Sequence, residues 1–287
     1  MPNISGPGPS LRSQWLGDKI RDLRKSRKMS LKEVGEYLQR DQGTISRYEN
    51  GELPVRRGDL AVMLDLFGVS DEKVRDDLEQ LRAECWRKDW WDQHKDDFGS
   101  DFINVPWLES RADSICTYQH FLVYGLFQTR RYAEAVISRL EADKASPEQI
   151  QRWVDLRIER QRILAADNPP EIDAVFESAV LERTAGSPAI MREQLQRLLE
   201  IGDSAAATIR FVPTAVGPHT GLSGSFNLFK MPEPYPAVAY VETTAGALYA
   251  EEPKASSFEA VWQDLDRSAL SAARSIDLIA KRLKEIE

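Results

Sequence analysis

Residues 42–49 combine short polar side chains, which can make hydrogen bonds to a ligand, with apolar side chains at helical spacing. A Gln side chain pairs with adenine, an Arg with guanine, and the methyl group of a Thr contacts thymine. Ile45 and Tyr48 lie on the other side of the same helical period, where they can be buried. The pattern therefore predicts a recognition helix that reads double-stranded DNA in the major groove. Its candidate DNA-contacting residues are Gln42, Thr44, Ser46 and Arg47.

Capping signals position this helix. Ser30 and Glu33 form a capping box that predicts a helix over residues 31–38. Asp41 can cap the next helix, which ends at Asn50 because Asn and the following Gly tolerate positive φ. A capped helix, a turn of about four residues and a second short helix have the spacing of a helix-turn-helix motif.

The segment around this motif is basic, whereas the chain as a whole is acidic. Residues 12–57 contain twelve Lys or Arg and seven Asp or Glu, but the formal net charge of all 287 residues is −8. Lys28 and Lys32 lie beside the expected recognition helix, where they can neutralise DNA phosphates. The alternative is a chance clustering of charge on a solvated helix face.

Two stretches, SLKEVGEYL (30–38) and QGTISRYENG (42–51), closely resemble the phage-repressor-like, Xre-type helix-turn-helix family. The resemblance implies a mainly α, lambda-repressor-like bundle over residues 13–80. It also implies an internal ion pair between Arg24 and Glu49. Implied base contacts come from Gln42, Gly43, Thr44 and Arg47, and implied phosphate contacts come from Arg40, Ser46 and Asn50.

The remainder of the chain predicts an α+β domain over residues 107–287, after a flexible tail (1–12) and an aromatic-rich linker (81–106). The expected helices are 107–125, 129–142, 147–166, 188–201 and 256–286. The expected strands are 171–180, 207–212, 224–230 and 237–242, with a fifth β-like run near Tyr249.

This second part is similar to the antitoxin-like C-terminal domain (DUF5753) of a family of actinobacterial regulators. The similar stretches are Trp107–Glu109, Tyr118–Gln119, Gly125–Thr129 with Tyr132, Arg157 with Arg160 and Gln161, and His219–Phe226. The resemblance implies a small partner protein encoded nearby.

Several function classes are disfavoured by composition and motifs. The apolar runs are too short to span a membrane, and the two cysteines, Cys85 and Cys116, are too few for a disulfide framework. No recognised catalytic or metal-binding motif is present, so we expect no enzyme, no metal and no cofactor. The overall expectation is a cytoplasmic, DNA-binding transcriptional regulator.

Two alternative functions stay open. The chain could be an antitoxin-like module that binds a small partner protein, or a sensor whose small-molecule effector binds near Trp107, Tyr118 or His219. Four tryptophans form either a packed junction or a ligand cage: Trp86, Trp90, Trp91 and Trp107. A homodimer would suit a short recognition helix. Its candidate surfaces are the stripe Val74, Leu78, Leu81 and the stripe Leu270, Ile276, Ile279, Leu283, each of which can instead be internal core.

Overall fold

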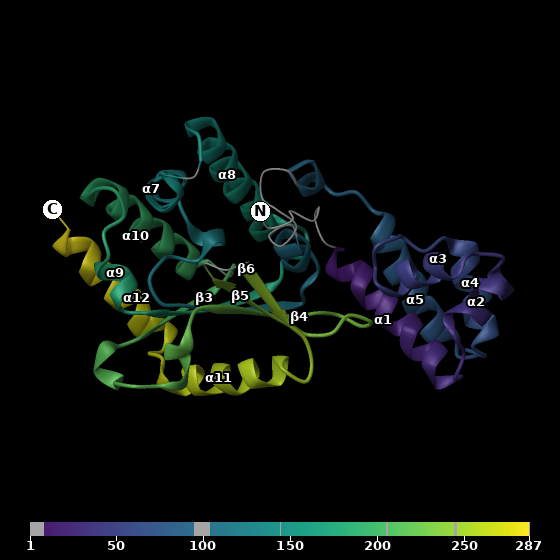
Figure 1. Cartoon of the computed structure of the whole chain (residues 1–287). Coiled ribbons are helices and arrows are strands. Elements are labelled where there is room, and N and C mark those ends of the chain that lie inside the picture. Colours follow the sequence, from purple (N-terminus) through teal and green to yellow (C-terminus); the bar gives the residue numbers. More distant parts are fainter. Residues whose placement is uncertain (1–8, 95–103, 144, 205, 244–245, 287) are drawn as a thin grey trace. The chain divides into compact units, whose positions relative to one another are not determined.

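The computed structural model describes residues 9–94, 104–143, 145–204, 206–243 and 246–286 (Figure 1). The chain divides into two compact units, residues 1–104 and 105–287. The expected tail falls outside the described residues over 1–8, and the expected linker does so over 95–103. Within the described ranges, no helix combines the length and the apolar character needed to cross a membrane.

The amino-terminal unit is a helical bundle, coloured purple to blue in Figure 1. Its core consists of apolar side chains from all five α-helices, among them Ile20, Val34 and Ile45, which are fully buried. This arrangement confirms the mainly α expectation. The elements are α1 (Leu11–Ser26), α2 (Leu31–Leu38), α3 (Gln42–Glu49), α4 (Arg57–Leu66), α5 (Glu72–Trp86) and the 3₁₀ helix η1 (Trp90–His94).

Both expected caps in this bundle are confirmed. The Ser30 hydroxyl accepts from the backbone N–H of Glu33, and the Glu33 carboxylate accepts from the backbone N–H of Ser30. Asp41 accepts from the backbone N–H of Thr44 at the start of α3. Helix α1 begins at Leu11, inside the segment expected to be a tail, because Ser10 caps it.

The carboxyl-terminal unit is built on one six-stranded mixed sheet of order β3-β2-β1-β4-β5-β6, which confirms the α+β expectation. Strands β1, β2 and β3 are parallel, whereas β4, β5 and β6 continue the sheet in antiparallel pairs. The strands are β1 (Ser114–Gln119), β2 (Glu171–Glu177), β3 (Thr208–Val212), β4 (Phe226–Lys230), β5 (Val238–Thr243) and β6 (Gly246–Ala250).

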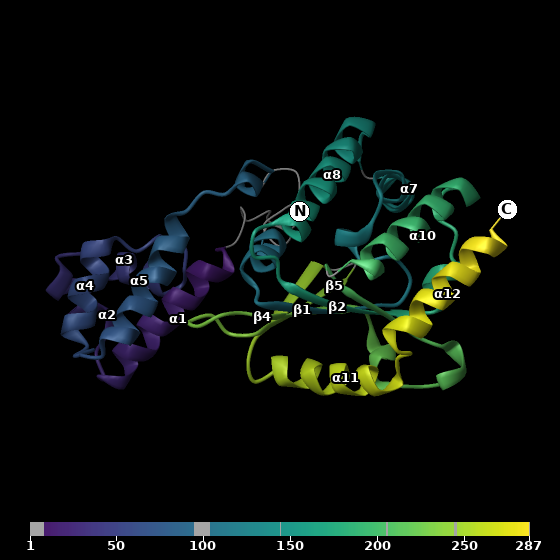
Figure 2. The same ribbon diagram turned by 180° about the vertical axis from the view of Figure 1, so that it is seen from behind.

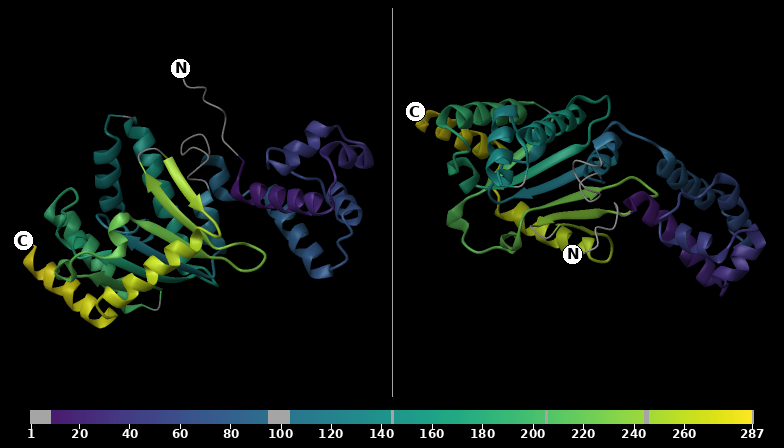
Figure 3. Two further views of the ribbon diagram at one scale, coloured as in Figure 1. Left: turned by 60° about the horizontal axis from the view of Figure 1, so that its bottom comes forward. Right: turned by 45° about the horizontal axis from the view of Figure 1, so that its top comes forward.

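Helices cover both faces of this sheet. Figures 1 and 2 show α11 on one face and α7, α8 and α10 on the opposite face, and Figure 3 shows the same layers in two further views. The helices are α7 (Arg130–Glu141), α8 (Pro147–Arg160), α9 (Ala179–Glu182), α10 (Pro188–Asp203), α11 (Ala255–Ser268) and α12 (Ala272–Glu285), with 3₁₀ turns η2 (Gly125–Phe127), η3 (Gln161–Ala165), η4 (Thr214–Val216) and η5 (Thr220–Ser223).

Two expected helices are wrong in part. The expected helix over 107–125 is helical as far as residue 111 and then contains β1, a central strand that is buried on both faces, so its side chains lack the alternation of apolar and polar types that marks a strand. The expected single helix over 256–286 is two helices. The backbone N–H of Leu270 donates to the carbonyl of Phe211 on β3, and Ser271 caps α12.

The two stripes considered for dimerisation are only partly buried. Leu78, Leu81 and Ile279 are buried, Val74 is 38% exposed, and the other three residues, Leu270, Ile276 and Leu283, are half-buried. Among the tryptophans of the amino-terminal unit, Trp91 is buried, with its ring edge-on to that of Trp90 at 5.5 Å.

Candidate nucleic-acid interface

The turn between α2 and α3 holds the two helices at close range. Gln39 adopts the left-handed conformation (φ 54°), which ends α2 after two turns. A Cβ added at Gly35 would lie 2.8 Å from the carbonyl oxygen of Arg40, so the start of the turn packs directly on the α2 backbone. The helix-turn-helix geometry therefore depends on a residue with no side chain at position 35.

Some polar side chains of α3 are exposed to solvent, whereas that of Thr44 is bonded to the cap residue Asp41. Gln42, Gly43 and Arg47 are exposed and Ser46 is half-buried. Thr44 is 9% exposed, and its hydroxyl donates to the Asp41 carboxylate at 2.6 Å. The side chains that remain open to a ligand on α3 are therefore chiefly those of Gln42 and Arg47.

Asp59 of α4 joins the turn to the recognition helix. Its Oδ2 accepts from the Tyr48 hydroxyl at 2.7 Å, and both carboxylate oxygens accept from the Arg40 guanidinium at 3.2 Å. Burial alone would raise the pKa of Asp59, but the hydrogen bonds from Arg40 and Tyr48 lower it. Burial and the Asp59 contact raise the pKa of Tyr48 to about 12, so the phenol stays a hydrogen-bond donor at neutral pH.

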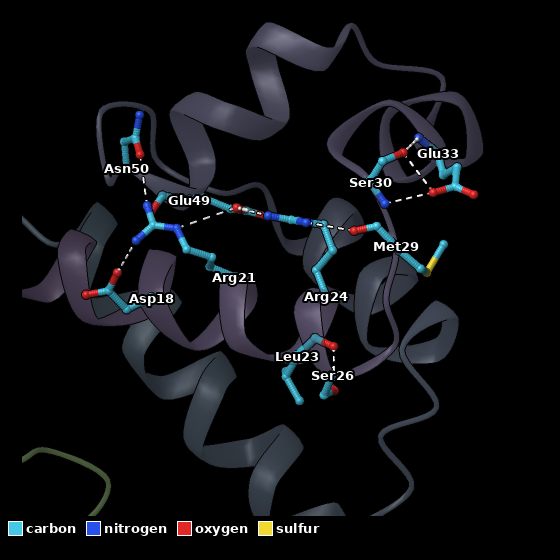
Figure 4. Close-up of polar contacts among 10 residues, drawn as sticks. All are labelled: Asp18, Arg21, Leu23, Arg24, Ser26, Met29, Ser30, Glu33, Glu49 and Asn50. Carbon is cyan, nitrogen blue, oxygen red and sulfur yellow. Dashed lines mark hydrogen bonds and ion pairs between the residues drawn. The ribbon is translucent and has the colours of Figure 1, made fainter.

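Helix α1 is joined to the end of α3 by a network of arginines (Figure 4). The Arg24 guanidinium donates to Glu49 through Nε at 2.6 Å and through Nη2 at 2.8 Å, and to the carbonyl of Met29 through Nη1. Arg21 donates to the carbonyl of Glu49 and to Oδ1 of Asn50. The hydrogen bond to Glu49 raises the pKa of Arg24. These contacts anchor the carboxyl-terminal end of α3 to the bundle.

The residues suggested for phosphate contact lie in different environments. Lys28 and Lys32 are exposed, and Lys32 has a weak i,i+4 pair with Glu36 at 3.7 Å. Arg40 is held by Asp59, and Asn50 by Arg21. The two lysines are therefore free to reorient toward a phosphate, whereas Arg40 and Asn50 are fixed in place.

A groove of about 410 Å³ runs beside α3 and is lined in part by three arginines, Arg40, Arg47 and Arg56. Arg56 is exposed at the start of α4. Arg56 and Asp59 were not among the site residues predicted from the sequence. The only signal for Arg56 was the Arg-Arg pair after Pro54, and no local signal ties Asp59 to Arg40, which precedes it by 19 residues.

In the carboxyl-terminal unit, the structure brings two of the three suggested effector residues together. The Tyr118 hydroxyl donates to Glu177 Oε1 at 2.5 Å, and His219 Nε2 lies 3.0 Å from the same oxygen. His219 Nδ1 is buried and has no hydrogen-bond partner in the described part of the chain. Trp107 is buried edge-on against Tyr235.

Residues 219–225, which precede β4, pack closely against the cluster of Tyr118, Glu177 and His219. His120 Nε2 lies 2.8 Å from the carbonyl oxygen of Gly221, and Thr220 donates twice to Asp264 of α11. A Cβ at Gly221 would lie 2.7–2.9 Å from Leu265 and Tyr118. Within the described ranges, no three His, Cys, Asp or Glu residues form a group that could hold a metal ion.

Comparison with known proteins gives two matches. A family model described as a helix-turn-helix domain matches residues 15–78. A second, described as a domain of unknown function (DUF5753), matches residues 102–281, which is more than half of the chain. No curated protein and no solved structure matches.

Proposed function

Because the chain belongs to the DUF5753 family and also carries a helix-turn-helix domain, we propose that it is a sequence-specific, Xre-type transcriptional regulator that reads DNA with α3. The helix-turn-helix domain by itself suggests a DNA-binding regulator. The observation that carries the finer proposal is the contrast along α3. Its exposed polar side chains stand on a helix that Asp59 and Arg24 hold in place from two other helices.

Base reading in this proposal depends mainly on Gln42 and Arg47. Both are exposed, and their side chains suit bidentate pairing with adenine and guanine, respectively. Thr44 contributes less through its hydroxyl, because that hydroxyl is bonded to Asp41. Gly43 has no side chain and lets the backbone approach the bases closely.

Phosphate binding in this proposal comes from both sides of the recognition helix. Lys28 and Lys32 are exposed near the start of α2, and Arg56 is exposed in the groove beside α3. Each guanidinium or ammonium that reaches a phosphate releases counterions, so affinity falls as salt rises. These contacts set affinity, whereas Gln42 and Arg47 set the preferred sequence.

A selection from random duplexes followed by fluorescence anisotropy tests the proposal. We expect Gln42→Ala and Arg47→Ala each to weaken binding of the selected site by about 1–3 kcal/mol and to relax its sequence preference. Lys281→Ala, which removes an exposed charge from α12, is the matched control and leaves binding unchanged. The reader assignment fails if both α3 variants bind the selected site as tightly as the wild type.

We further propose that the regulator is a cytoplasmic homodimer that binds a palindromic site. One eight-residue helix spans only a few base pairs, and a second copy supplies a second half-site about one helical turn away. Light scattering of the protein with and without its selected duplex tests this point. Two protomers per duplex support it, and one protomer per duplex contradicts it.

Binding of a small partner protein is the alternative that a specific observation favours. Phe121 and Leu222 are 58% and 54% exposed, and the contact between His120 and Gly221 joins the two segments that carry them. Exposed apolar side chains that form a contiguous patch are typical of a protein-binding surface. Co-purification with the products of neighbouring genes tests this alternative, with Phe121→Ser and Leu222→Ser expected to reduce capture.

A further inference from the structure

Of two arginines one turn apart on α8, Arg157 and Arg160, only Arg160 contacts a buried carboxylate, that of Glu109. Arg160 donates to Glu109 through Nε at 2.9 Å and through Nη2 at 2.5 Å, and the Tyr124 hydroxyl donates to the same carboxylate at 3.1 Å. The Arg160 and Glu109 side chains are 7% and 2% exposed. Among the described residues, Arg160 is therefore the cation that pairs with Glu109 at ion-pair distance.

Arg157 has no such partner. Its Nη1 donates to the amide oxygen of Gln128 at 3.0 Å, which is a neutral acceptor. Gln128 is itself held in place, because its amide group donates to the carbonyl of Val123 at 2.6 Å. Within the part of the chain that the structure describes, the Nε and Nη2 groups of Arg157 make no hydrogen bond, and no carboxylate oxygen lies within 4.0 Å of the guanidinium.

The charge on this guanidinium is poorly compensated. Burial, together with the neighbouring charge of Arg160, lowers the pKa of Arg157 to about 10. Glu242, an exposed residue of β5, and Glu109 oppose this effect, both from beyond ion-pair distance of Arg157. A half-buried cation without a contacting counterion is a costly arrangement in a folded protein, and it favours the binding of an anion.

Gly125 puts no side chain of its own beside Nε of this guanidinium. A Cβ added at Gly125 would lie 4.0 Å from Arg157 Nε, so a larger residue at this position would contact that edge. The Nε and Nη2 groups donate in parallel, which is the geometry that matches the two oxygens of a carboxylate.

We propose that the Nε–Nη2 edge of Arg157 binds the carboxylate group of a small organic ligand, with Gln128 fixing the plane of the guanidinium. A single negative charge balances the one uncompensated cation. A phosphate dianion would leave an excess negative charge beside Glu109 and Glu242. This site is separate from DNA binding, and its test contains no DNA, so its failure leaves the proposed regulator function untouched.

The test uses the full chain and three carboxylate probes of different shape: acetate, succinate and benzoate. Each is titrated at constant ionic strength against thermal unfolding and by calorimetry, with chloride and inorganic phosphate in parallel. We expect a saturable rise in Tm with at least one carboxylate. We expect its apparent Kd to weaken at least tenfold in Arg157→Gln and also in Arg157→Lys, which keeps a cation but lacks the fork.

Two further variants sharpen the test. Gly125→Val keeps the charge of Arg157 but fills the space beside Nε, so we expect it to weaken carboxylate binding at least tenfold as well. This variant keeps the test decisive if Arg157→Gln does not fold. Arg162→Gln removes an exposed arginine just after α8, whose side chain is 79% exposed, and leaves the apparent Kd unchanged.

Four outcomes overturn the proposal. The first is that none of the three carboxylates binds saturably, and the second is that chloride produces the same rise in Tm. The third is an apparent Kd that is the same in the wild type and in the folded Arg157 and Gly125 variants. The fourth is that inorganic phosphate binds at least as tightly as every carboxylate, which would contradict the assigned ligand class.

Discussion

Replacing Glu49 with Gln tests whether the contact between α1 and α3 fixes the recognition helix. The Glu49 side chain is 4% exposed and accepts two hydrogen bonds from Arg24, whose side chain is 11% exposed. Arg21 Nε lies 3.6 Å from the same carboxylate. Gln is nearly the same size, so the change removes a charge and one acceptor while leaving no cavity.

The expected cost follows from the partners that remain. After Glu49→Gln, Arg24 contacts no other carboxylate in the described part of the chain, and the new amide N–H₂ group faces guanidinium donors. Removing one partner of a buried pair costs about 3–5 kcal/mol. Arg24→Met is expected to cost less, about 1–3 kcal/mol, because Glu49 keeps Arg21 nearby.

Urea unfolding of the full chain measures both effects, and hydrogen exchange assigns the transition. We expect faster exchange over α1 and α3 in Glu49→Gln, with the sheet of the carboxyl-terminal unit unchanged. The double variant Arg24→Met with Glu49→Leu should lose less than the sum of its two single changes, because neither charge is left unpaired. A cost below about 1 kcal/mol for Glu49→Gln, or strictly additive costs in the double variant, would refute the reasoning.

Three further predictions concern single side chains. Asp59→Asn removes the charge that holds Arg40 and Tyr48, so urea unfolding should show a loss of about 1–3 kcal/mol, and an unchanged midpoint would contradict this. Arg56→Ala should lower the slope of log affinity against log salt by about 1 in anisotropy titrations, and an unaltered slope would exclude a phosphate contact. Burial raises the pKa of Cys116 from 9.0 to about 11, so the unfolded state loses its proton first and stability falls by roughly 2–3 kcal/mol between about pH 9 and pH 11. Urea midpoints across this range should fall less in Cys116→Val, and parallel profiles would count against the assignment.

Short-range signals in the sequence were sufficient for the helix-turn-helix motif. The Ser30–Glu33 box and the Asp41 cap each span four residues or fewer, and both occur in the structure as expected. Such caps satisfy backbone groups at a helix end with a side chain close by in the chain, so the sequence contains both partners.

The apolar pattern was a weaker guide in the second unit. Strand β1 is central and buried on both faces, so its side chains show no alternation, and the pattern of Ser114–Gln119 was mistaken for helix. The break before α12 depends on the Leu270 N–H reaching the carbonyl of Phe211, a partner far away in the sequence. Where the backbone's hydrogen-bond partner is distant, local periodicity cannot locate the end of an element.

The fold class, the position of α3 and the residue types on its exposed face could be predicted from the order of the amino acids, because helix caps and helical periodicity are local. The tertiary structure was needed to show which polar side chains bind one another. Asp59 accepts hydrogen bonds from Arg40 and Tyr48. Glu109 pairs with Arg160 rather than Arg157, and both Tyr118 and His219 contact Glu177. The physical reason is that the pairing of a buried charge depends on which side chains the packed elements bring within hydrogen-bond distance, and that proximity is set by the fold.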